Sequence, residues 1–368
     1  MIDDALIAHV LDLLVAIQQV PAPPFGEEQR AAFVQERFQV EGLTDVATDD
    51  VGNVYARLPG SNAQPPVVIS AHLDTVFPFG TDLRVRREED RIFGPGIGDN
   101  SLGLAGLFGL LWALRQQRGE TLALPGDLWF VANVGEEGLG DLRGMREVVK
   151  RFGSRVQAYV ILEGMALGQV YHRALGVRRY RITARTVGGH SWVDYGRPSA
   201  IHELAALVTR LTALPVPQEP RSSLNVGVIA GGTSVNTIAP EAHLELDLRS
   251  EGSTALQSLT RLVEDVVVTA NRPDVQFTCE LIGQRPAGKI SSTHPLVRLA
   301  QRALQVQGLE AHLAIGSTDA NIPLSRGLPA VTIGLTTGHG AHTVNEYIHT
   351  QPLAKGLAQL VSLIEGVW

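Results

Sequence analysis

Histidine and carboxylate side chains recur directly after apolar stretches of this 368-residue sequence, where they could bind metal ions. Two divalent ions that share one carboxylate and one water each need two further protein ligands to be four-coordinate. We expect His72 and Glu163 to bind one ion. Glu137 and His342 would bind the other, and Asp99 would be shared by both. Such a pair of ions can activate the shared water.

Glu136 is the carboxylate that this assignment leaves over. A carboxylate beside a ligand, but not on the metal, can take the proton of a bridging water, so we expect Glu136 to be the general base. Glu136 and Glu137 could instead form a solvated acidic turn, which would be the better interpretation of an isolated pair. Gly135 and Gly138 flank the pair after a predicted strand, and this context favours a site.

The first ligand follows a predicted buried strand. Residues 67–71 are apolar and rich in β-branched side chains, and Pro65 and Pro66 precede them, which is typical of a strand. His72 and Asp74 lie two residues apart, so both can point from one face of an extended chain. A ligand histidine needs its second nitrogen held, and we expect the Asp74 carboxylate to hold it. Considered alone, the two residues would suggest only an ordinary surface turn.

The same arrangement recurs along the chain. Predicted strands at 127–132 and 158–162 end shortly before Glu136 and Glu163, and a buried helix is expected at 102–114, after Asp99. Because ligands of open α/β folds bind outside the carboxyl ends of the strands, we expect one α/β unit with its acidic sites at one sheet edge. Its other predicted elements are helices at 2–19, 27–40, 295–307 and 352–364 and strands at 44–48, 53–58, 311–315 and 330–335.

A second unit is predicted inside the first. Between residues 176 and 287 the pattern becomes strand, helix, two strands, helix and strand, which is the ferredoxin-like βαββαβ order. We therefore expect residues 1–175 and 288–368 to form a catalytic domain and residues 176–287 an inserted domain. The elements predicted in the insertion are strands at 177–187, 222–229, 243–249 and 275–281 and helices at 199–214 and 254–270.

Composition and charge exclude several classes of protein. The formal net charge of -7 argues against a nucleic-acid-binding surface, which needs a basic excess. The longest apolar run, at 102–114, is too short to span a bilayer, and the first residues lack the basic region of a signal peptide. Cys279 is the only cysteine, which excludes an intrachain disulfide. We expect a cytoplasmic protein without a membrane or nucleic-acid partner.

The motifs, taken in order, resemble those of the co-catalytic dizinc exopeptidase and deacylase family that includes carboxypeptidase G2, aminoacylase 1, peptidase T and succinyl-diaminopimelate desuccinylase. The resemblance covers nearly the whole chain. It rests on His72-Leu73-Asp74, Gly98-Asp99-Asn100, Glu136-Glu137-Gly138, Leu162-Glu163-Gly164 and Ala341-His342-Thr343-Val344-Asn345-Glu346.

This resemblance implies an α/β fold, in which a mixed-sheet, zinc-exopeptidase-like catalytic domain carries an inserted lid or dimerisation domain. It also implies two zinc ions, with cobalt or manganese as alternatives, hydrolysis of peptide or amide bonds, and a cis peptide between Asp99 and Asn100. Family members often carry Lys where this chain has Ser101. That departure affects no metal ligand.

The resemblance extends to three residues of the insertion. His190 resembles the histidine that reaches a neighbouring subunit's site and stabilises the tetrahedral intermediate, which implies a homodimer. Asn236 resembles a second contact to the same oxyanion. Arg249 resembles the arginine that binds a substrate carboxylate, a task suited to a bidentate fork. Without the family, each could be an ordinary loop or surface residue.

Two histidines compete with His342 for the last ligand position. His339 and His349 lie close to it in sequence, but Thr343 and Glu346 have the spacing of a capping box, which would fix the backbone beside His342. We therefore favour His342.

Two other polar residues receive no catalytic role. Asp319 resembles part of a family loop that borders the substrate pocket, and we expect it to line that pocket without binding metal. His172 is expected to be structural.

The leading hypothesis is an exopeptidase of short peptides, near the peptidase T branch, because residues 163–168 resemble a segment of that branch. The alternatives are an N-acyl amino acid deacylase or a glutamate-type carboxypeptidase of the same family. A catalytically silent metal-binding homologue would lack Glu136 or a ligand, and none is missing. A serine hydrolase is disfavoured because the chain has no Gly-x-Ser-x-Gly elbow.

Overall fold

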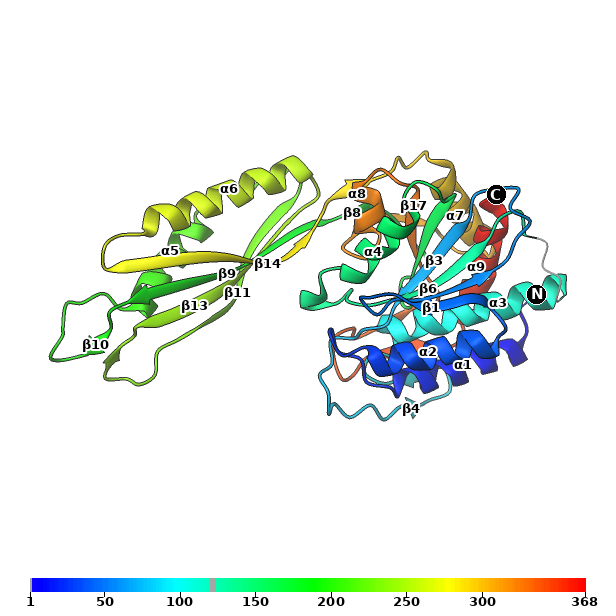
Figure 1. Cartoon of the computed structure of the whole chain (residues 1–368), viewed down its shortest axis with the longest axis horizontal. Coiled ribbons are helices and arrows are strands. Elements are labelled where there is room, and N and C mark those ends of the chain that lie inside the picture. The colour runs from blue at the N-terminus through cyan, green and yellow to red at the C-terminus, as the bar shows by residue number, and fades with distance from the viewer. Residues whose placement is uncertain (1, 120–123) are drawn as a thin grey trace. The chain divides into compact units, whose positions relative to one another are not determined.

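The computed structural model describes residues 2–119 and 124–368 and divides the chain into two compact units. The first unit contains Met1–Ala174 and Lys289–Trp368, and the second contains Leu175–Gly288 (Figure 1). Each unit has its own cluster of buried apolar side chains.

A mixed nine-stranded sheet forms the centre of the first unit. Strand β3 is parallel to both of its neighbours, β6 and β7, and β17 is parallel to β7. Strand β2 runs antiparallel to β1 and β6, whereas β8 is antiparallel to β17 and parallel to β16. All six residues of β3 are buried, as expected of a central strand covered on both faces. The order is β1 (Thr44–Thr48), β2 (Val54–Leu58), β6 (Leu128–Asn133), β3 (Val67–His72), β7 (Ala158–Glu163), β17 (Ala330–Gly334), β8 (Gln169–Ala174) and β15 (Gly288–Lys289), with β16 (His312–Gly316) paired to β8.

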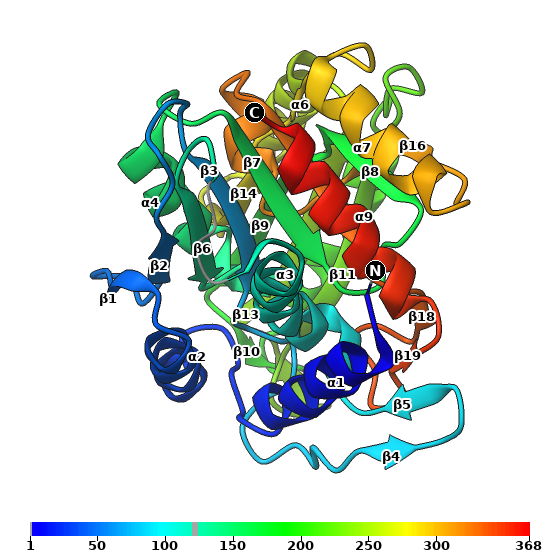
Figure 2. The same ribbon diagram turned by 90° about the vertical axis from the view of Figure 1, so that its right-hand side faces the viewer.

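Helices cover both faces of this sheet. Helix α3 (Gly103–Arg118) packs on β3 and β7, α7 (Pro295–Val306) packs on β17 and β8, and α9 (Leu353–Gly366) contacts both helices (Figure 2). Helix α1 (Asp4–Gln18) covers α3. Helices α4 (Arg143–Phe152) and α8 (Asn321–Ser325) contact each other and pack on β6 and β8 respectively, while α2 (Glu28–Val40) packs on β1 and β2.

Local sequence explains why the helices lie where they do. Helix α1 is amphipathic, buries Val10, Leu14 and Ile17, and is capped by Asp3, whose carboxylate accepts the Leu6 N–H at 2.8 Å. Helix α3 is apolar on all sides as far as Leu114, so it can be buried between the sheet and α1. By length and composition, the stretch Ile97–Gln117 could cross a membrane, but 89% of its most apolar window is buried inside the protein, as in the core helix of a globular domain.

The second unit has the predicted βαββαβ order. Its antiparallel sheet has the order β11-β13-β9-β14, and α5 and α6 pack against it. Paired residues across β9 and β13 carry opposite charges, such as Arg181 with Glu245 at 2.7 Å and Arg185 with Glu241 at 2.8 Å, which supports this register. The elements are β9 (Gly176–Thr186), α5 (Ala200–Thr212), β11 (Ser222–Gly231), β13 (Glu241–Ser250), α6 (Ser253–Ala270) and β14 (Val275–Arg285), with the short strands β10 (Gly189–His190) and β12 (Thr237–Ile238).

Several elements were not predicted from the sequence. They include β8, α4, α8 and a small sheet in the first unit made of β4 (Arg86–Arg87), β5 (Arg91–Phe93), β18 (Gly338–His339) and β19 (Tyr347–His349). An irregular turn, η1 (Ile97–Leu102), leads into α3 and contains a cis peptide between Asp99 and Asn100, as the family resemblance implied.

Candidate metal centre

Three neighbouring parallel strands bring the candidate ligands to one edge of the large sheet. His72 is the last residue of β3, Glu163 is the last residue of β7, and Glu136 and Glu137 follow the end of β6. Because β6, β3 and β7 are adjacent and parallel, their carboxyl ends meet at the same edge. The predicted clustering of these side chains therefore follows from strand order.

One group of ligand atoms surrounds the His72 ring. His72 Nε2 lies 3.2 Å from Asp99 Oδ1 and 3.8 Å from Glu163 Oε2. At these distances the three side chains could bind one common ion. They form one of three groups in which the possible ligand atoms all lie within 4.8 Å of one another.

A second group shares Asp99 with the first. His342 Nε2 lies 3.2 Å from Asp99 Oδ2 and 3.2 Å from Glu137 Oε1. The two oxygens of Asp99 therefore face two different imidazoles, as a carboxylate shared by two ions requires. The structure brings together all five expected metal ligands.

Glu136 belongs to a third group, with His72 and Glu137. Its side chain is buried, and the residue is only 6% exposed. Among the described residues, no group of candidate ligands contains both Glu136 and Asp99, whereas Glu137 occurs in a group with Asp99 and His342. This difference favours Glu137 over Glu136 as the ligand.

Asp74 contacts the His72 ring through its backbone carbonyl and, at ion-pair distance, through the carboxylate that was expected to hold the ring. His72 Nδ1 lies 2.9 Å from the backbone carbonyl oxygen of Asp74 but 3.6 Å from Asp74 Oδ1. The carboxylate also accepts the backbone N–H groups of Glu136 at 3.0 Å and Glu137 at 2.7 Å. Because an acceptor with a negative charge binds N–H donors strongly, Asp74 positions the turn that carries both glutamates.

A second buried carboxylate holds the same turn. Glu27 Oε1 accepts the N–H of Gly135 at 3.1 Å, and Arg143 donates to both Glu27 oxygens at 2.7 and 2.8 Å. Sequence patterns gave Glu27 only as the start of a helix, and its link to Gly135 spans 108 residues of sequence.

The expected capping box after His342 is not formed. No helix begins at residues 341–346, and Thr343 Oγ1 donates to the carbonyl of Gly340 at 2.7 Å. The Glu346 carboxylate accepts backbone N–H groups from a distant turn, those of Gly96 at 2.9 Å, Gly98 at 2.7 Å and Asp99 at 2.8 Å. The Thr-x-x-Glu spacing thus correctly indicated that the Glu346 side chain accepts backbone N–H groups, but the donors lie in a distant turn and not beside His342.

Proximity of the carboxylates shifts the titration of both candidate histidines. Burial opposes charging of His72, but its contacts with Asp74, Asp99 and Glu163 raise its pKa well above 6.5. Contact with Asp99 and Glu137 raises the pKa of His342 to about 10. Protons and metal ions therefore compete for these nitrogens, and ion binding should release protons.

The pKa values of the two carboxylates Glu163 and Asp99 shift in opposite directions. Burial raises the pKa of Glu163. Asp99 is also penalised by burial, but His342 and His72 together lower its pKa. Asp99 therefore stays ionised between the two rings.

The donor set fits divalent metal ions. Imidazole nitrogens and carboxylate oxygens are common zinc ligands, and the His72 Nδ1 contact with a backbone carbonyl leaves Nε2 available as the ligand atom. The residues could hold two ions, with His72, Asp99 and Glu163 around one and Asp99, Glu137 and His342 around the other.

The competing histidines have other contacts. The ring of His339 packs on Tyr347, with centroids 5.8 Å apart, and His349 Nδ1 lies 3.6 Å from Asp90 Oδ2. Neither histidine occurs in the candidate ligand groups of the described residues. His172 is buried, with Nδ1 2.8 Å from the carbonyl oxygen of Ile290, as expected of a structural residue.

Asp319 is fully buried, so it does not offer a surface to a substrate in this structure. Its Oδ2 accepts from Asn133 Nδ2 at 2.7 Å, while its Oδ1 and the Asn133 Oδ1 have no hydrogen-bond partner. Burial raises the pKa of Asp319 to about 7. Asn133 ends β6, so Asp319 supports that strand just before the Glu136 turn.

Two of the expected substrate contacts lie together at one end of the second unit. His190 pairs with Thr237 in the two-stranded ribbon of β10 and β12, and the Asn236 carbonyl accepts the N–H of Ser191 at 3.0 Å. His190 Nδ1 accepts the backbone N–H of Trp192 at 3.2 Å. A neutral ring with Nδ1 as acceptor carries its proton on Nε2, so His190 can donate a hydrogen bond.

Arg249 lies at the other end of the same unit. It is close to the carboxyl end of β13 and pairs with Val177, whereas His190 and Asn236 adjoin the end of β13 that begins at Glu241. Eight residues of strand separate Glu241 from Arg249, or about 26 Å at the usual rise. Within one chain, Arg249 and His190 therefore cannot contact the same small ligand.

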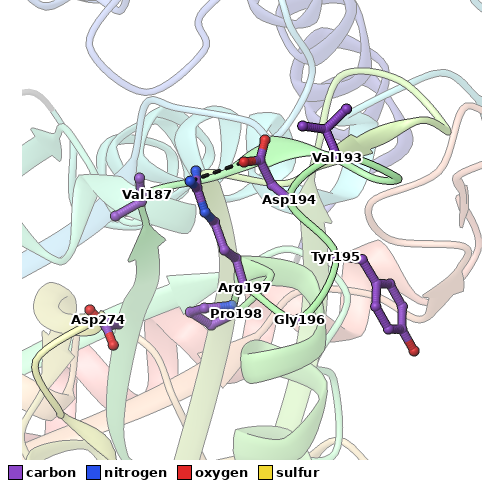
Figure 3. Close-up of a pocket in the computed structure, with 8 residues that line it drawn as sticks. All are labelled: Val187, Val193, Asp194, Tyr195, Gly196, Arg197, Pro198 and Asp274. Carbon is purple, nitrogen blue, oxygen red and sulfur yellow. Dashed lines mark ion pairs between the residues drawn. The ribbon is translucent and has the colours of Figure 1, made fainter.

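A cavity of about 720 Å³ adjoins the His190 loop in the second unit. Asp194 and Arg197 form an ion pair at 2.9 Å on its wall (Figure 3). Asp194 Oδ2 also accepts the N–H of His190 at 2.8 Å, which links this wall to the histidine. The lining residues are Val187, Val193, Asp194, Tyr195, Gly196, Arg197, Pro198 and Asp274.

Comparison with known proteins gives a family match and related structures. The sequence model of Peptidase family M20/M25/M40 matches residues 68–366. A tripeptidase from Staphylococcus aureus has a similar structure, with a TM-score of 0.82, 22% identity and coverage of 98% of each chain. The YXEP protein of Bacillus subtilis, a dinuclear metal binding peptidase, has a TM-score of 0.68 and 18% identity, with coverage of 99% of this chain and 98% of the other.

A relative with a different substrate is equally similar in sequence. The succinyl-diaminopimelate desuccinylase of Corynebacterium glutamicum is 22% identical over 350 residues, which cover 93% of this chain and 92% of the relative. Similarity at this level therefore supports a common fold but does not distinguish a peptide from an N-acyl substrate.

Proposed function

The chain belongs to Peptidase family M20/M25/M40, a family of metal-dependent hydrolases, and we propose that it uses two metal ions to hydrolyse short peptides. The observation that carries this proposal is the position of Asp99. Its two oxygens lie 3.2 Å from the Nε2 atoms of His72 and His342, which are separated by 270 residues of sequence. Two ions bridged by one carboxylate explain why these groups converge.

Two bound ions, zinc in our proposal with cobalt or manganese as alternatives, would polarise the scissile carbonyl and activate a water. Glu136 takes the proton of that water and later delivers it to the leaving amine. Asp74 and Glu27 keep the turn in place, because they hold the N–H groups of residues 135–137. The general base is thereby fixed beside the ligands without being one.

In this proposal the second unit supplies substrate contacts. His190 donates through Nε2 to the developing oxyanion, and Asn236 assists it. Since Arg249 lies about 26 Å along the strand from the His190 end, one substrate would meet Arg249 of one subunit and His190 of another. This separation supports a homodimer in which the second unit forms the interface.

The proposed substrate is a short peptide with a free carboxylate. Similarity to the tripeptidase from Staphylococcus aureus supports a peptide substrate. Similarity to the desuccinylase of Corynebacterium glutamicum makes an N-acyl amino acid the alternative substrate. A glutamate-type carboxypeptidase and a catalytically silent metal-binding homologue also remain alternatives. The cytoplasmic location stays a prediction.

A metal titration combined with a substrate panel tests the proposal. Protein purified without chelator should contain about two divalent ions per chain and should hydrolyse di- or tripeptides faster than N-acyl amino acids. Faster cleavage of N-acyl amino acids would instead indicate a deacylase. A single ion with no second site on titration, or no amide hydrolysis with zinc, cobalt or manganese, would contradict the proposal.

A further inference from the structure

The Glu346 side chain is fully buried next to the metal centre, yet it belongs to none of the candidate ligand groups among the described residues. Both of its oxygens are used. Oε1 accepts the N–H groups of Gly98 and Asp99, and Oε2 accepts that of Gly96, all within 2.9 Å. None of the ion pairs found in the described ranges includes Glu346. The backbone N–H groups are therefore the hydrogen-bond partners of this carboxyl group.

These contacts join two loops that each carry a candidate ligand. The turn at residues 94–99 ends at Asp99, and the loop at residues 340–346 contains His342. A backbone bond from Gly94 N–H to the Glu346 carbonyl, at 2.9 Å, adds to the connection. The two loops are about 250 residues apart in sequence, and the pairing of Phe93 with Tyr347, in strands β5 and β19, also ties them together.

The pairing of β18 with β19 closes the loop that carries His342, but His342 itself lies outside those strands. Its backbone is left-handed, with φ of 64°, it lies outside any helix or strand, and its side chain is 55% exposed. The Thr343 N–H and hydroxyl both bond to Gly340, which closes the loop on itself. Within the loop, Glu346, four residues from His342, is bonded to the turn that carries Asp99.

We propose that Glu346 is a positioning residue that sets the distance between Asp99 and His342 and so determines the affinity of the ion held by Asp99, Glu137 and His342. The inference rests on the proposed dinuclear site. The ion held by His72, Asp99 and Glu163 should depend on Glu346 less, because His72 and Glu163 end strands of the large sheet.

The test replaces Glu346 and measures ion binding directly. Glu346→Gln keeps the shape but removes one acceptor, so its amide must point at one of the three N–H donors. Glu346→Asp keeps the charge but is one methylene too short to reach all three. Glu89→Gln is the matched control, since Glu89 is exposed in the same unit. Each protein is stripped with EDTA and titrated with Co²⁺, followed by calorimetry and by the visible absorption of the bound ion.

In both Glu346 variants the affinity for the ion held by His72, Asp99 and Glu163, the first ion, should change less than tenfold. The affinity for the ion held by Asp99, Glu137 and His342, the second ion, should fall roughly 10- to 100-fold, which is the usual effect of losing a group that orients metal ligands. The absorption spectrum of the second ion should change as well. Glu89→Gln should match wild type. If wild type binds only one ion, the dinuclear proposal itself fails.

A purely structural role for Glu346 predicts a different result. The EDTA-treated variants would then unfold at a lower temperature but bind both ions with wild-type affinity, and that outcome would overturn the inference. Should Glu346→Gln fail to fold, Glu346→Asp decides the question by the same titration. If the first ion were weakened as much as the second, the assignment to the His342 ion would be wrong.

Discussion

The metal centre of the first unit and the His190 end of the second unit are built in contrasting ways. In the first, Asp74, Glu136 and Glu137 are at most 6% exposed, and carboxylates hold the backbone of the ligand turns. In the second, His190 ends the short strand β10, and Trp192 and Tyr195 in the loop that follows are 85% and 90% exposed. The first region is thus largely enclosed by the fold, apart from His342 with its 55% exposed side chain, whereas the second presents its side chains to solvent.

The contrast has a physical reason. Several carboxylates close together in a buried site repel one another, and each needs fixed donors or cations to stay ionised. Asp74, Glu27 and Glu346 all accept backbone N–H groups. At Asp74, His72 and these N–H groups lower the pKa against burial, whereas burial raises the pKa of Glu27 and raises that of Glu346 to about 7. An exposed loop carries no such requirement and is free to adapt when it contacts a partner. We therefore expect substitutions in the first region to act on ions and chemistry, and those in the second on substrate and assembly.

The largest effect should come from Glu136. Glu136→Gln removes the proton acceptor and keeps the shape, so kcat should fall by about 10² to 10⁴. Metal content should not change, because Glu136 is not assigned as a ligand. Glu137→Gln should instead weaken the binding of one ion. The measurements are kcat and metal stoichiometry on both variants.

These adjacent glutamates are each other's control, since both are buried and both have their N–H groups held by Asp74. If Glu136→Gln loses an ion while Glu137→Gln keeps two, the assignment is reversed.

His190 tests the exposed region. His190→Ala should lower kcat by about 10² to 10³, which is typical for loss of one oxyanion donor. His202→Ala, at an exposed position on α5, should have no effect. Mixing inactive His190→Ala with inactive Glu136→Gln subunits should restore part of the activity if the two residues serve a site from different subunits. No recovery after demonstrated subunit exchange would argue that His190 acts within its own chain.

Asp319 tests how far a buried carboxyl group in the first region lowers the stability of the folded protein. A carboxyl that titrates near 3.8 when unfolded and at about 7 when folded keeps more protons in the folded state between these values. Stability should therefore fall as pH rises from 4 to 7, by up to ~1.4 kcal/mol per pH unit. Asp319→Asn removes this loss and should be more stable than wild type above pH 7, but not below pH 4.

The measurement for Asp319 is urea unfolding in EDTA across this pH range. His72, Asp74 and Glu163 also act on Asp319, so the difference between variant and wild type is the informative quantity. Parallel curves for the two proteins would mean that Asp319 is ionised throughout.

The sequence predicted the strands that carry the ligands because their patterns are local. The apolar run at 67–71 became β3, and the βαββαβ order of the insertion was confirmed. Strand β8, by contrast, has the mixed sequence Gln169–Ala174, and its partners β16 and β17 lie more than 130 residues away. Short strands of this kind form only once distant partners are in place, so local patterns miss them.

The candidate site shows the same division. Residue types and spacing singled out all five side chains that converge at the sheet edge. They did not show that the Asp74 carboxylate would bind the Glu136 turn, or that Glu346 would reach Gly96 across 250 residues. Such contacts depend on which loops the fold brings together, and that is a property of the tertiary structure.

Substitution of Arg249, on the solvent-exposed face of the sheet in the second unit, should give the smallest effect. Asp247 is shared by two guanidinium groups, accepting from Arg249 Nε at 2.7 Å and from Arg179 Nε at 3.1 Å. Arg249 therefore shares its partner carboxylate, and its side chain is 42% exposed, so it is available to a substrate carboxylate. Arg249→Ala should raise KM for free-acid peptides about tenfold and leave kcat nearly unchanged, since the contact acts on ground and transition states alike.

The control for Arg249 lies on the same face. Arg181 has the same exposed side-chain fraction, 42%, but its partner Glu245 has no second arginine in the described ion pairs. Arg181→Ala should therefore leave KM unchanged. Peptides with an amidated carboxyl terminus should be insensitive to Arg249→Ala, because they lack the charge that Arg249 is proposed to bind. An equal loss for free-acid and amidated peptides would mean that Arg249 acts on the sheet and not on the substrate.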